Sequence, residues 1–384
     1  MQALAQDFTI VARSPARDVF AREPALVRLP SGRLMATFAF LSQRGHEIAL
    51  GELAVPRVPE FATLNVCISE DDGASWETRS RLNWEAGMPL FIEGELYLIG
   101  NRPGRRDIMI TRSRDDGSSW LPEVTLFAGQ FWNCPTGVAL KDGFLYRAFG
   151  GNEAAGRETL VIAGDVSRDL MHPASWRMSN RLPFPGIPRE MVRDGQSGSA
   201  HWLEPNIVAA GERLYVVSAV KLTSRHGWAT PGLVALCELD DRNDALDYRF
   251  VQYHPAPGGQ LKFHIVHDDV SGLYWRTMNL PADTAMPPDP RWEARGNFGG
   301  DRRLLALSYS IDALNWIQAG CIAITPRPWE GFHYAMPLID GDDMLVIART
   351  SLDGVNQHES NLITLHRVRD FRRLAVCDVH PRFD

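Results

Sequence analysis

The chain has 384 residues, of which 45% are hydrophobic and 23% charged, and it contains 32 Gly, 25 Pro and 11 Trp. These proportions are ordinary for a folded protein and exclude a disordered, collagenous or coiled-coil chain. The formal net charge of -7 argues against a surface that coats nucleic acid, but it is compatible with a local basic pocket for an acidic ligand.

The segment up to Pro30 carries charges throughout and lacks the continuous apolar run of a signal peptide. No stretch approaches the ~18 apolar residues of a membrane-spanning helix, so no membrane partner is expected. The sequence therefore predicts a cytoplasmic protein, or a secreted or periplasmic one whose signal peptide has been removed. The cysteines are far apart, odd in number and without a C-x-x-C pair, which predicts buried free thiols at Cys67, Cys134, Cys237, Cys321 and Cys377.

Short apolar runs separated by polar turns recur along the chain. Each of five segments has the pattern strand, glycine-containing turn, strand, and they cover 20–40, 88–99, 136–146, 207–217 and 337–347. No segment sustains the spacing of an amphipathic helix over more than a few turns. Residues 280–300 are rich in Pro and Gly and lack alternation, which predicts a long loop.

An octapeptide of the form S-x-D-D-G-x-S-W occurs twice, from Ser69 to Trp76 and from Ser113 to Trp120. Ser and Asp side chains can bond back to nearby backbone amides, and Gly takes a positive φ at little cost, so the pattern predicts a tight, self-bonded turn. The Trp supplies an apolar plate that packs the turn against its sheet.

Two degenerate copies keep S-x-D and a later Trp, from Ser167 to Trp176 and from Ser310 to Trp316. Hairpins that alternate with such turns, about one per four-stranded sheet, are typical of a β-propeller. We therefore predict an all-β, six-bladed β-propeller over residues 1–384 as a single domain. A β-sandwich or a β-helix is the structural alternative.

The S-x-D-x-G-x-x-W turn resembles the Asp-box, or BNR repeat, of the sialidase (neuraminidase) superfamily. In that superfamily the turn is structural and does not touch substrate. The resemblance implies a sialidase-like propeller and a site whose landmarks lie elsewhere in the chain.

Several landmarks of the sialidase site have counterparts here. Arg22, in Arg22-Glu23-Pro24, resembles the family arginine that grips the substrate carboxylate, with Glu in place of the family's Ile. Glu204 resembles the catalytic glutamate that precedes an apolar strand. Lys221 stands where the second arginine of the family's triad would be, and a lysine offers a point charge instead of a bidentate fork.

The remaining landmarks lie in the last third of the chain. Arg302 or Arg303 fits the third arginine, and Tyr334 in Gly331-Phe332-His333-Tyr334-Ala335 resembles the tyrosine nucleophile. The resemblance implies that Glu204 is the base for the Tyr334 hydroxyl, whose ordinary pKa near 10 makes it a poor nucleophile alone. The family's acid/base aspartate has no match before Ser69, where Glu60 or Glu47 could substitute.

A second chemistry, a polysaccharide lyase, needs no such aspartate. A cation neutralises a uronate carboxylate while a His or Tyr removes the α-proton. The candidates for these proton transfers are His201, His264, His267, His333, Tyr146, Tyr274 and Tyr334. Alternation places Lys262 and His264 on one surface, as in a site or a solvated edge strand, and it points His264 and His267 apart, which disfavours a metal site.

The prediction from sequence is an exo-acting glycoside hydrolase for a glycan with a terminal acidic sugar, without cofactor or metal. Tyr334, Glu204, His333 and His264 are the candidate catalytic residues. The candidate substrate-binding residues are Arg22, Arg302, Arg303, Lys221, Lys262, His201 and Arg349, and His358 and Asn361 are weaker candidates. The alternatives are the uronate lyase and a non-catalytic glycan- or protein-binding propeller, which would disperse these residues around its rim.

Overall fold

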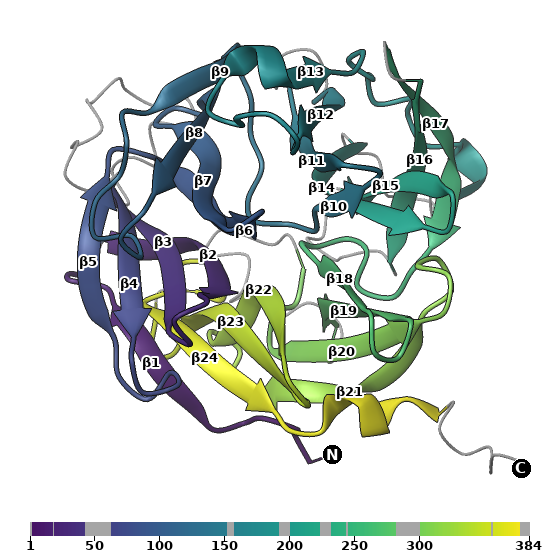
Figure 1. The fold of residues 1–384 in the computed structure, drawn as a ribbon. Coiled ribbons are helices and arrows are strands. Elements are labelled where there is room, and N and C mark those ends of the chain that lie inside the picture. Colours follow the sequence, from purple (N-terminus) through teal and green to yellow (C-terminus); the bar gives the residue numbers. More distant parts are fainter. Residues whose placement is uncertain are drawn as a thin grey trace, which may run out of the picture.

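The protein is described here from a computed structural model. It describes residues 2–17, 19–42, 63–151, 157–191, 200–222, 232–242, 245–281, 300–354 and 356–376. These residues form six antiparallel four-stranded sheets arranged around a common centre (Figure 1). The predicted six-bladed β-propeller is therefore confirmed, and the sandwich and β-helix alternatives are wrong.

Each sheet, or blade, is a meander whose first strand lies innermost. Blade 1 consists of β2 (Val19–Arg28), β3 (Leu34–Ser42), β4 (Thr63–Ser69) and β5 (Glu77–Leu82). Blade 2 consists of β6 (Ala86–Ile92), β7 (Glu95–Arg102), β8 (Arg106–Ser113) and β9 (Val124–Gln130). Blade 3 consists of β10 (Ala139–Lys141), β11 (Phe144–Gly150), β12 (Thr159–Asp165) and β13 (Trp176–Met178).

The second half of the ring repeats this arrangement. Blade 4 consists of β14 (Ala200–Ala210), β15 (Arg213–Leu222), β16 (Leu233–Asp241) and β17 (Leu246–Pro255). Blade 5 consists of β18 (His264–Asp268), β19 (Leu273–Leu280), β20 (Leu304–Ser310) and β21 (Ile317–Ile324). Blade 6 consists of β22 (Gly331–Asp340), β23 (Asp343–Ser351), β24 (Leu362–Val368) and β1 (Phe8–Arg13).

Both ends of the chain contribute to blade 6. The N-terminal strand β1 pairs antiparallel with β24, with Phe8 opposite His366, and it becomes the outermost strand of that blade. The buried His366 also binds the Ala5 carbonyl through Nδ1 at 2.8 Å. The ring is thus closed by hydrogen bonds between its first and last strands.

All five hairpins predicted from sequence are present. The β6–β7 and β10–β11 connections are two-residue turns, Glu93-Gly94 and Asp142-Gly143, in which both residues have positive φ. Such turns match the right-handed twist of the flanking strands. The described helices are three short 3₁₀ turns, η3 (Pro173–Ser175), η4 (Arg189–Met191) and η5 (Phe371–Leu374).

The octapeptides 69–76 and 113–120, here called the Ser-Asp turns, fold alike between the third and fourth strands of blades 1 and 2. In the first turn the Ser69 hydroxyl donates to Asp71 at 2.8 Å and accepts from the Gly73 amide at 2.8 Å. The Ser75 amide and hydroxyl donate to the two Asp71 oxygens. The second turn repeats every one of these bonds.

The two degenerate copies differ from each other. Ser310 donates to Asp312, which accepts from the amide and side chain of Asn315, so the copy from Ser310 to Trp316 keeps the turn. Ser167 instead lies two residues beyond the end of β12 and donates to Asp165. The copy at Ser167 therefore matches the sequence pattern but does not form the same turn.

Each Ser-Asp turn is hydrogen-bonded to the preceding blade. Thr9 of β1 donates to the Gly73 carbonyl at 2.8 Å, and Ser80 of β5 donates to the Gly117 carbonyl at 2.6 Å. Ser80 also accepts from Trp120 Nε1 at 2.9 Å. The turns thus join neighbouring blades, which gives the repeated motif a structural role.

The apolar core lies between successive blades. Met35, Leu64 and Val66 of blade 1, for example, share one buried cluster with Leu98 and Met109 of blade 2. Cys67, Cys134, Cys237 and Cys321 are buried free thiols, as expected, whereas Cys377 lies outside the described residues.

Two other predictions concern parts of the chain that the structure describes incompletely. Most of the predicted loop 280–300 lies outside the described residues. Within the described ranges, no helix is long and apolar enough to cross a membrane.

Candidate functional site

Three inner strands carry the same irregularity. In β2, β14 and β22 the pairing register breaks at Arg22–Ala25, Leu203–Asn206 and His333–Met336. One residue in each bulge has a left-handed backbone: Glu23 (φ 49°), Glu204 (φ 53°) and Tyr334 (φ 51°). Non-glycine residues in this region are strained, and such strain concentrates at functional sites.

The sequence around the bulges suits this geometry. Glu23 and Glu204 are each followed by proline, which lacks an N–H and is tolerated in a strand where the ladder is already broken. The bulges lie toward the start of the inner strands. The Ser-Asp turns lie at the other end of the sheet, because Ser69 pairs with Leu34 and Leu34 with Arg28, the last residue of β2.

The three bulge residues converge near the axis of the ring. Burial raises the pKa of Tyr334 well above 10, and the charges of Glu204 and Glu23 raise it further. The structure thus brings the predicted nucleophile and its predicted base together, and it adds a second carboxylate, Glu23, which is 5% exposed. Burial also raises the pKa of Glu23 above its ordinary 4.5.

Arg349 is the cation in closest contact with this group. Its guanidinium carbon lies 4.3 Å from the centre of the Tyr334 ring, and its Nη1 lies 3.8 Å from Glu23 Oε1. The side chain is fully buried, and burial lowers its pKa to about 10. Arg349 therefore faces both the predicted nucleophile and the second carboxylate.

Arg22 approaches from β2 and is held by a carboxylate. Its Nη2 donates to Glu359 Oε2 at 2.7 Å, and Glu359 Oε1 bonds His358 Nδ1 at 2.6 Å. Glu359 is 5% exposed. It was not predicted as a site residue, and its role here is to orient the predicted carboxylate-binding arginine.

Several buried polar atoms in this cluster lack a hydrogen-bond partner among the described residues. They are Arg22 Nε, Glu23 Oε2, His333 Nδ1, and both Nε and Nη1 of Arg349. Buried polar groups are nearly always paired, so several at one place point to a ligand site.

Lys262 enters from the segment before β18. Its Nζ donates to the Ala335 carbonyl at 2.6 Å, next to Tyr334, and burial lowers its pKa below 10.5. Glu204, Glu23 and Cys134 lie near enough to act on that pKa. Lys262 therefore belongs to the central group, by which we mean the charged and polar residues around Glu23, Glu204 and Tyr334.

Further cations surround Glu204 and Tyr334. Arg302 is buried and lies in the field of both, and Lys221 lies in the field of Arg302 and Glu204. His201 lies opposite Lys221 in the sheet, and burial together with Arg157 and Lys221 lowers its pKa to about 4. His201 is therefore neutral near pH 7.

The adjacent arginines Arg302 and Arg303 contact different partners. Arg303 forms a two-pronged pair with Asp301, at 3.0 Å from Nε and 2.7 Å from Nη2. Arg302 instead acts electrostatically on Tyr334 and Glu204. Of the two, Arg302 is the one whose charge acts on Tyr334 and Glu204, so it stays the candidate for substrate binding.

Two residues that the sequence analysis missed also face this group, and a third supports one of them. Arg105 and Arg157 come from loops, and their charges act on Tyr334. Glu85 accepts from the amides of Gly104 and Arg105 and supports the first of these loops.

The candidate histidines and tyrosines are only partly brought together. His333 is buried beside Tyr334, and its Nε2 lies 3.0 Å from Ser360 Oγ. His264 is buried with Nδ1 3.3 Å from the Pro135 carbonyl, and burial holds its pKa well below 6.5.

The other candidates for lyase chemistry lie away from the central group. Tyr146 of blade 3 donates to Asp241 of blade 4, and Tyr274 donates to the Ala209 carbonyl while packing against the exposed His267. Asn361 bonds both backbone groups of Leu352 and has a structural role.

The aspartate expected before Ser69 has no described substitute in that segment. Glu47 and Glu60 lie outside the described residues. Asn65, at the start of β4, bonds the Phe38 and Thr63 carbonyls and accepts from Arg81. Within the described residues no group of His, Cys, Asp and Glu is arranged to hold a metal ion.

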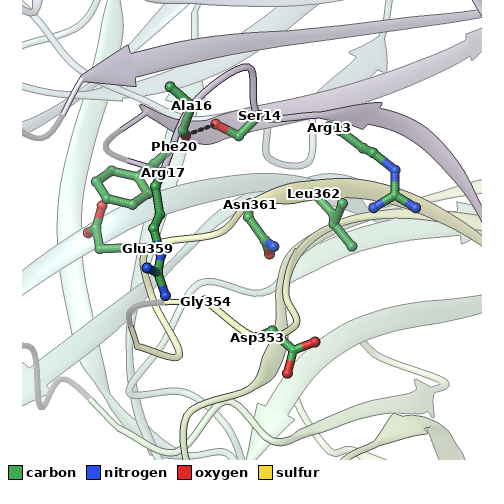
Figure 2. A pocket seen from close by; sticks show the side chains of 10 residues that line it. All are labelled: Arg13, Ser14, Ala16, Arg17, Phe20, Asp353, Gly354, Glu359, Asn361 and Leu362. Atoms are coloured by element: carbon green, nitrogen blue, oxygen red, sulfur yellow. Dashed lines mark hydrogen bonds between the residues drawn. The ribbon is translucent and has the colours of Figure 1, made fainter.

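A separate cavity opens where β1 leads into β2, between that connection and the β23–β24 loop (Figure 2). Its volume is about 310 Å³. It is lined by Arg13, Ser14, Ala16, Arg17, Phe20, Asp353, Gly354, Glu359, Asn361 and Leu362. Of the residues of the central group, Glu359 alone also lines this cavity.

No family model matches the sequence, and no curated protein matches it either. Solved structures match over most of the chain. An α-L-arabinanase from Penicillium chrysogenum, solved with arabinobiose, is 14% identical in sequence and superposes with a TM-score of 0.55. The match covers 95% of this chain and 98% of the arabinanase chain. A protein of unknown function from Dyadobacter fermentans is 12% identical, with a TM-score of 0.57 and the same two coverages.

A sialidase from Trypanosoma rangeli, solved with sialic acid, is 13% identical in sequence and superposes with a TM-score of 0.53. The match covers 92% of this chain and 55% of the sialidase chain. At such identities the likeness concerns the fold. The chain therefore has the propeller fold seen in sialidase and arabinanase structures.

Proposed function

We propose that this protein is a glycoside hydrolase that acts on the end of a glycan and holds a terminal acidic sugar. The observation that carries the proposal is the convergence of Tyr334, Glu204 and Glu23 from three inner strands among buried and partly buried cations. A tyrosine beside a glutamate is the arrangement by which some hydrolases replace the usual pair of carboxylates.

The charge of the site favours an anionic sugar. Among the described residues, seven cations act on this group, whereas four carboxylates accompany them. The cations are Arg22, Arg105, Arg157, Lys221, Lys262, Arg302 and Arg349, and the carboxylates are Glu23, Glu85, Glu204 and Glu359. A sugar carboxylate would offset part of this excess and would accept from the nitrogens of Arg22 and Arg349 that have no hydrogen-bond partner in the described part of the chain.

The proposed reaction uses Tyr334 as nucleophile and Glu204 as its base. Free ionisation of the tyrosine is disfavoured because burial and two nearby carboxylates raise its pKa. Its proton must therefore pass to Glu204 as the hydroxyl attacks the anomeric carbon. The Asp-box resemblance and the sialic acid named for the sialidase structure support this assignment.

Activity on a neutral sugar, as named for the arabinanase structure, is the competing hydrolase hypothesis. The cations around the site speak against it, since a neutral sugar would leave buried arginine donors without an acceptor. A non-catalytic glycan-binding propeller would disperse its polar residues around the rim. Here they gather around the three bulges instead.

The test uses aryl glycosides and oligosaccharides that end in a uronic or a nonulosonic acid, each beside its neutral counterpart. We expect release of the acidic sugar, with losses of more than about a hundredfold in Tyr334→Phe and Glu204→Gln. The matched control is Arg17→Ala, in the cavity that shares only Glu359 with the central group, and we expect it to keep its rate.

Elimination is distinguished in the same reactions. A lyase product gains absorbance at about 230 nm from its unsaturated uronate, because the α-proton is removed and not replaced. Such absorbance, or full activity in both variants, would contradict the proposed hydrolase.

A further inference from the structure

Glu23 occupies a position in β2 that corresponds to those of Glu204 in β14 and Tyr334 in β22. All three residues stand at the broken register of an innermost strand, and their φ angles fall between 49° and 53°. The same left-handed bulge therefore presents all three side chains to the central group. Two of them already have a role in the proposed function, and Glu23 has none.

The surroundings of Glu23 differ from those of a carboxylate kept for structure. Glu23 is 5% exposed, and its Oε2 has no hydrogen-bond partner among the described residues. The nearest cation, Arg349, stays at 3.8 Å from Oε1 and also stacks on Tyr334. By contrast, Glu359 is bound by both Arg22 and His358 at hydrogen-bond distance.

We propose that Glu23 is the proton donor to the glycosidic oxygen, taking the part for which the sequence offers no aspartate. The inference rests on the proposed function and names a third reacting group for it. A buried carboxyl with one free oxygen, beside the nucleophile and its base, is placed to give a proton to the leaving sugar and to take one back from water.

The protonation state of Glu23 is consistent with this role. Burial raises its pKa, and the negative charge of Glu204 adds to the effect. Arg349, Arg22 and Lys262 oppose it, and Arg105, Tyr334 and Cys134 also lie in its field. Two carboxyls that face one site cannot both ionise freely, so one of them holds a proton more readily.

The steps balance with these three groups. In the first half, the Tyr334 oxygen bonds to the anomeric carbon and passes its proton to Glu204, while the bond to the leaving oxygen breaks and Glu23 protonates that oxygen. In the second half, water gives a proton to Glu23 as its oxygen bonds to the anomeric carbon, and Glu204 returns the proton to the departing Tyr334 oxygen. No oxidant or cofactor is required.

The test compares Glu23→Gln on two substrates that share the acidic sugar. One carries a second sugar as leaving group, and the other carries a nitrophenolate, which leaves without a proton. We expect kcat/KM, which reports the first half of the reaction, to fall about a thousandfold on the first substrate and less than about tenfold on the second. We also expect the basic limb of the pH profile to disappear, and azide to restore turnover of the nitrophenyl substrate as a glycosyl azide.

Glu359→Gln is the matched control, since it alters a buried carboxylate that orients Arg22 but exchanges no proton. It should lose the same factor on both substrates and gain nothing from azide. Equal losses on both substrates in Glu23→Gln, without azide rescue, would overturn the role of Glu23 while leaving the hydrolase intact. A wild-type protein that cleaves neither substrate would instead overturn the proposed function and this inference with it.

Discussion

The left-handed backbone at the three bulges can be tested without any substrate. A residue with a Cβ at φ near 50° carries a strain of roughly 1–2 kcal/mol that glycine does not carry. At Glu204 (φ 53°) we therefore compare Glu204→Ala with Glu204→Gly. Both variants remove the carboxylate, so their difference in the free energy of unfolding isolates the backbone and the methyl group.

The matched control is Ala25→Gly, at the next paired position after the Glu23 bulge. Ala25 is fully buried and does not have a positive φ. Glycine there loses chain entropy and a methyl contact, which together are worth about 1–2 kcal/mol. At position 204 the relief of strain offsets the same losses, so glycine should be about as stable as alanine or more stable.

Urea denaturation of the four proteins provides the measurement. The midpoints should differ and the slopes should stay equal, because the surface exposed on unfolding is unchanged. The alanine-to-glycine change at 204 should be more favourable than that at 25 by roughly 1–2 kcal/mol. Equal losses at the two positions would refute the left-handed bulge and the equivalence of the three strands that depends on it.

Three further predictions follow from the described contacts. Gly117→Ala should lower the free energy of unfolding by ~1 kcal/mol more than Gly94→Ala in the same urea assay. Both glycines have φ near 80°, but a Cβ at 117 would meet a neighbouring side chain at 2.5 Å, whereas a Cβ at 94 would meet nothing within 4 Å. Equal losses in the two variants would contradict this account of the Ser-Asp turn. Burial alone would raise the pKa of Asp268, but the hydrogen bonds from Arg372 and Ser271 lower it to about 2. The ionised carboxylate therefore stabilises the fold above about pH 4, and this contribution is lost as the pH falls toward 2. Asp268→Asn should then lose ~2 kcal/mol at pH 7 and approach the wild type near pH 2 in thermal melts, whereas a constant gap at every pH would refute the pairing. Arg349→Met should raise KM for an acidic substrate about tenfold or more in steady-state assays, and an unchanged KM would exclude Arg349 from carboxylate binding.

Much of the fold could be predicted because its signals are local. The octapeptides determine their own turns, and the strand pairs around Gly94 and Gly143 are determined by two-residue loops. The copy at Ser167 shows the limit of this approach. It keeps the residue types, but Ser167 lies beyond the end of its strand, and the sequence pattern does not reveal that position.

The site was predicted less completely because its members come from all parts of the chain. Glu23 was treated only as a departure from the family's isoleucine. A signal for it was present, since Glu23-Pro24 and Glu204-Pro205 repeat the same dipeptide in two inner strands. Arg105 and Arg157 carried no comparable signal, because loops bring them to the centre only in the folded ring.

Alternation placed Lys262 and His264 on one surface, and the charge of Lys262 does act on His264, although the two side chains bond to different blades. The strand β18 begins at His264, so Lys262 precedes it and is not bound by strand geometry. The lysine reaches the Ala335 carbonyl in blade 6, whereas the histidine faces the Pro135 carbonyl at the entry to blade 3. The strand is also innermost, so the solvated edge considered for it is wrong.

The most direct test of the proposed function is to trap its covalent intermediate. A fluorinated acidic sugar with a good leaving group should form a stable glycosyl-enzyme, because fluorine slows both halves of the reaction and the good leaving group keeps the first half fast. Peptide mass spectrometry should then find the added sugar on Tyr334, with no labelling by the neutral analogue or in Tyr334→Phe. A label on Glu204 or Glu23, or labelling by the neutral analogue alone, would contradict the proposed hydrolase of acidic sugars.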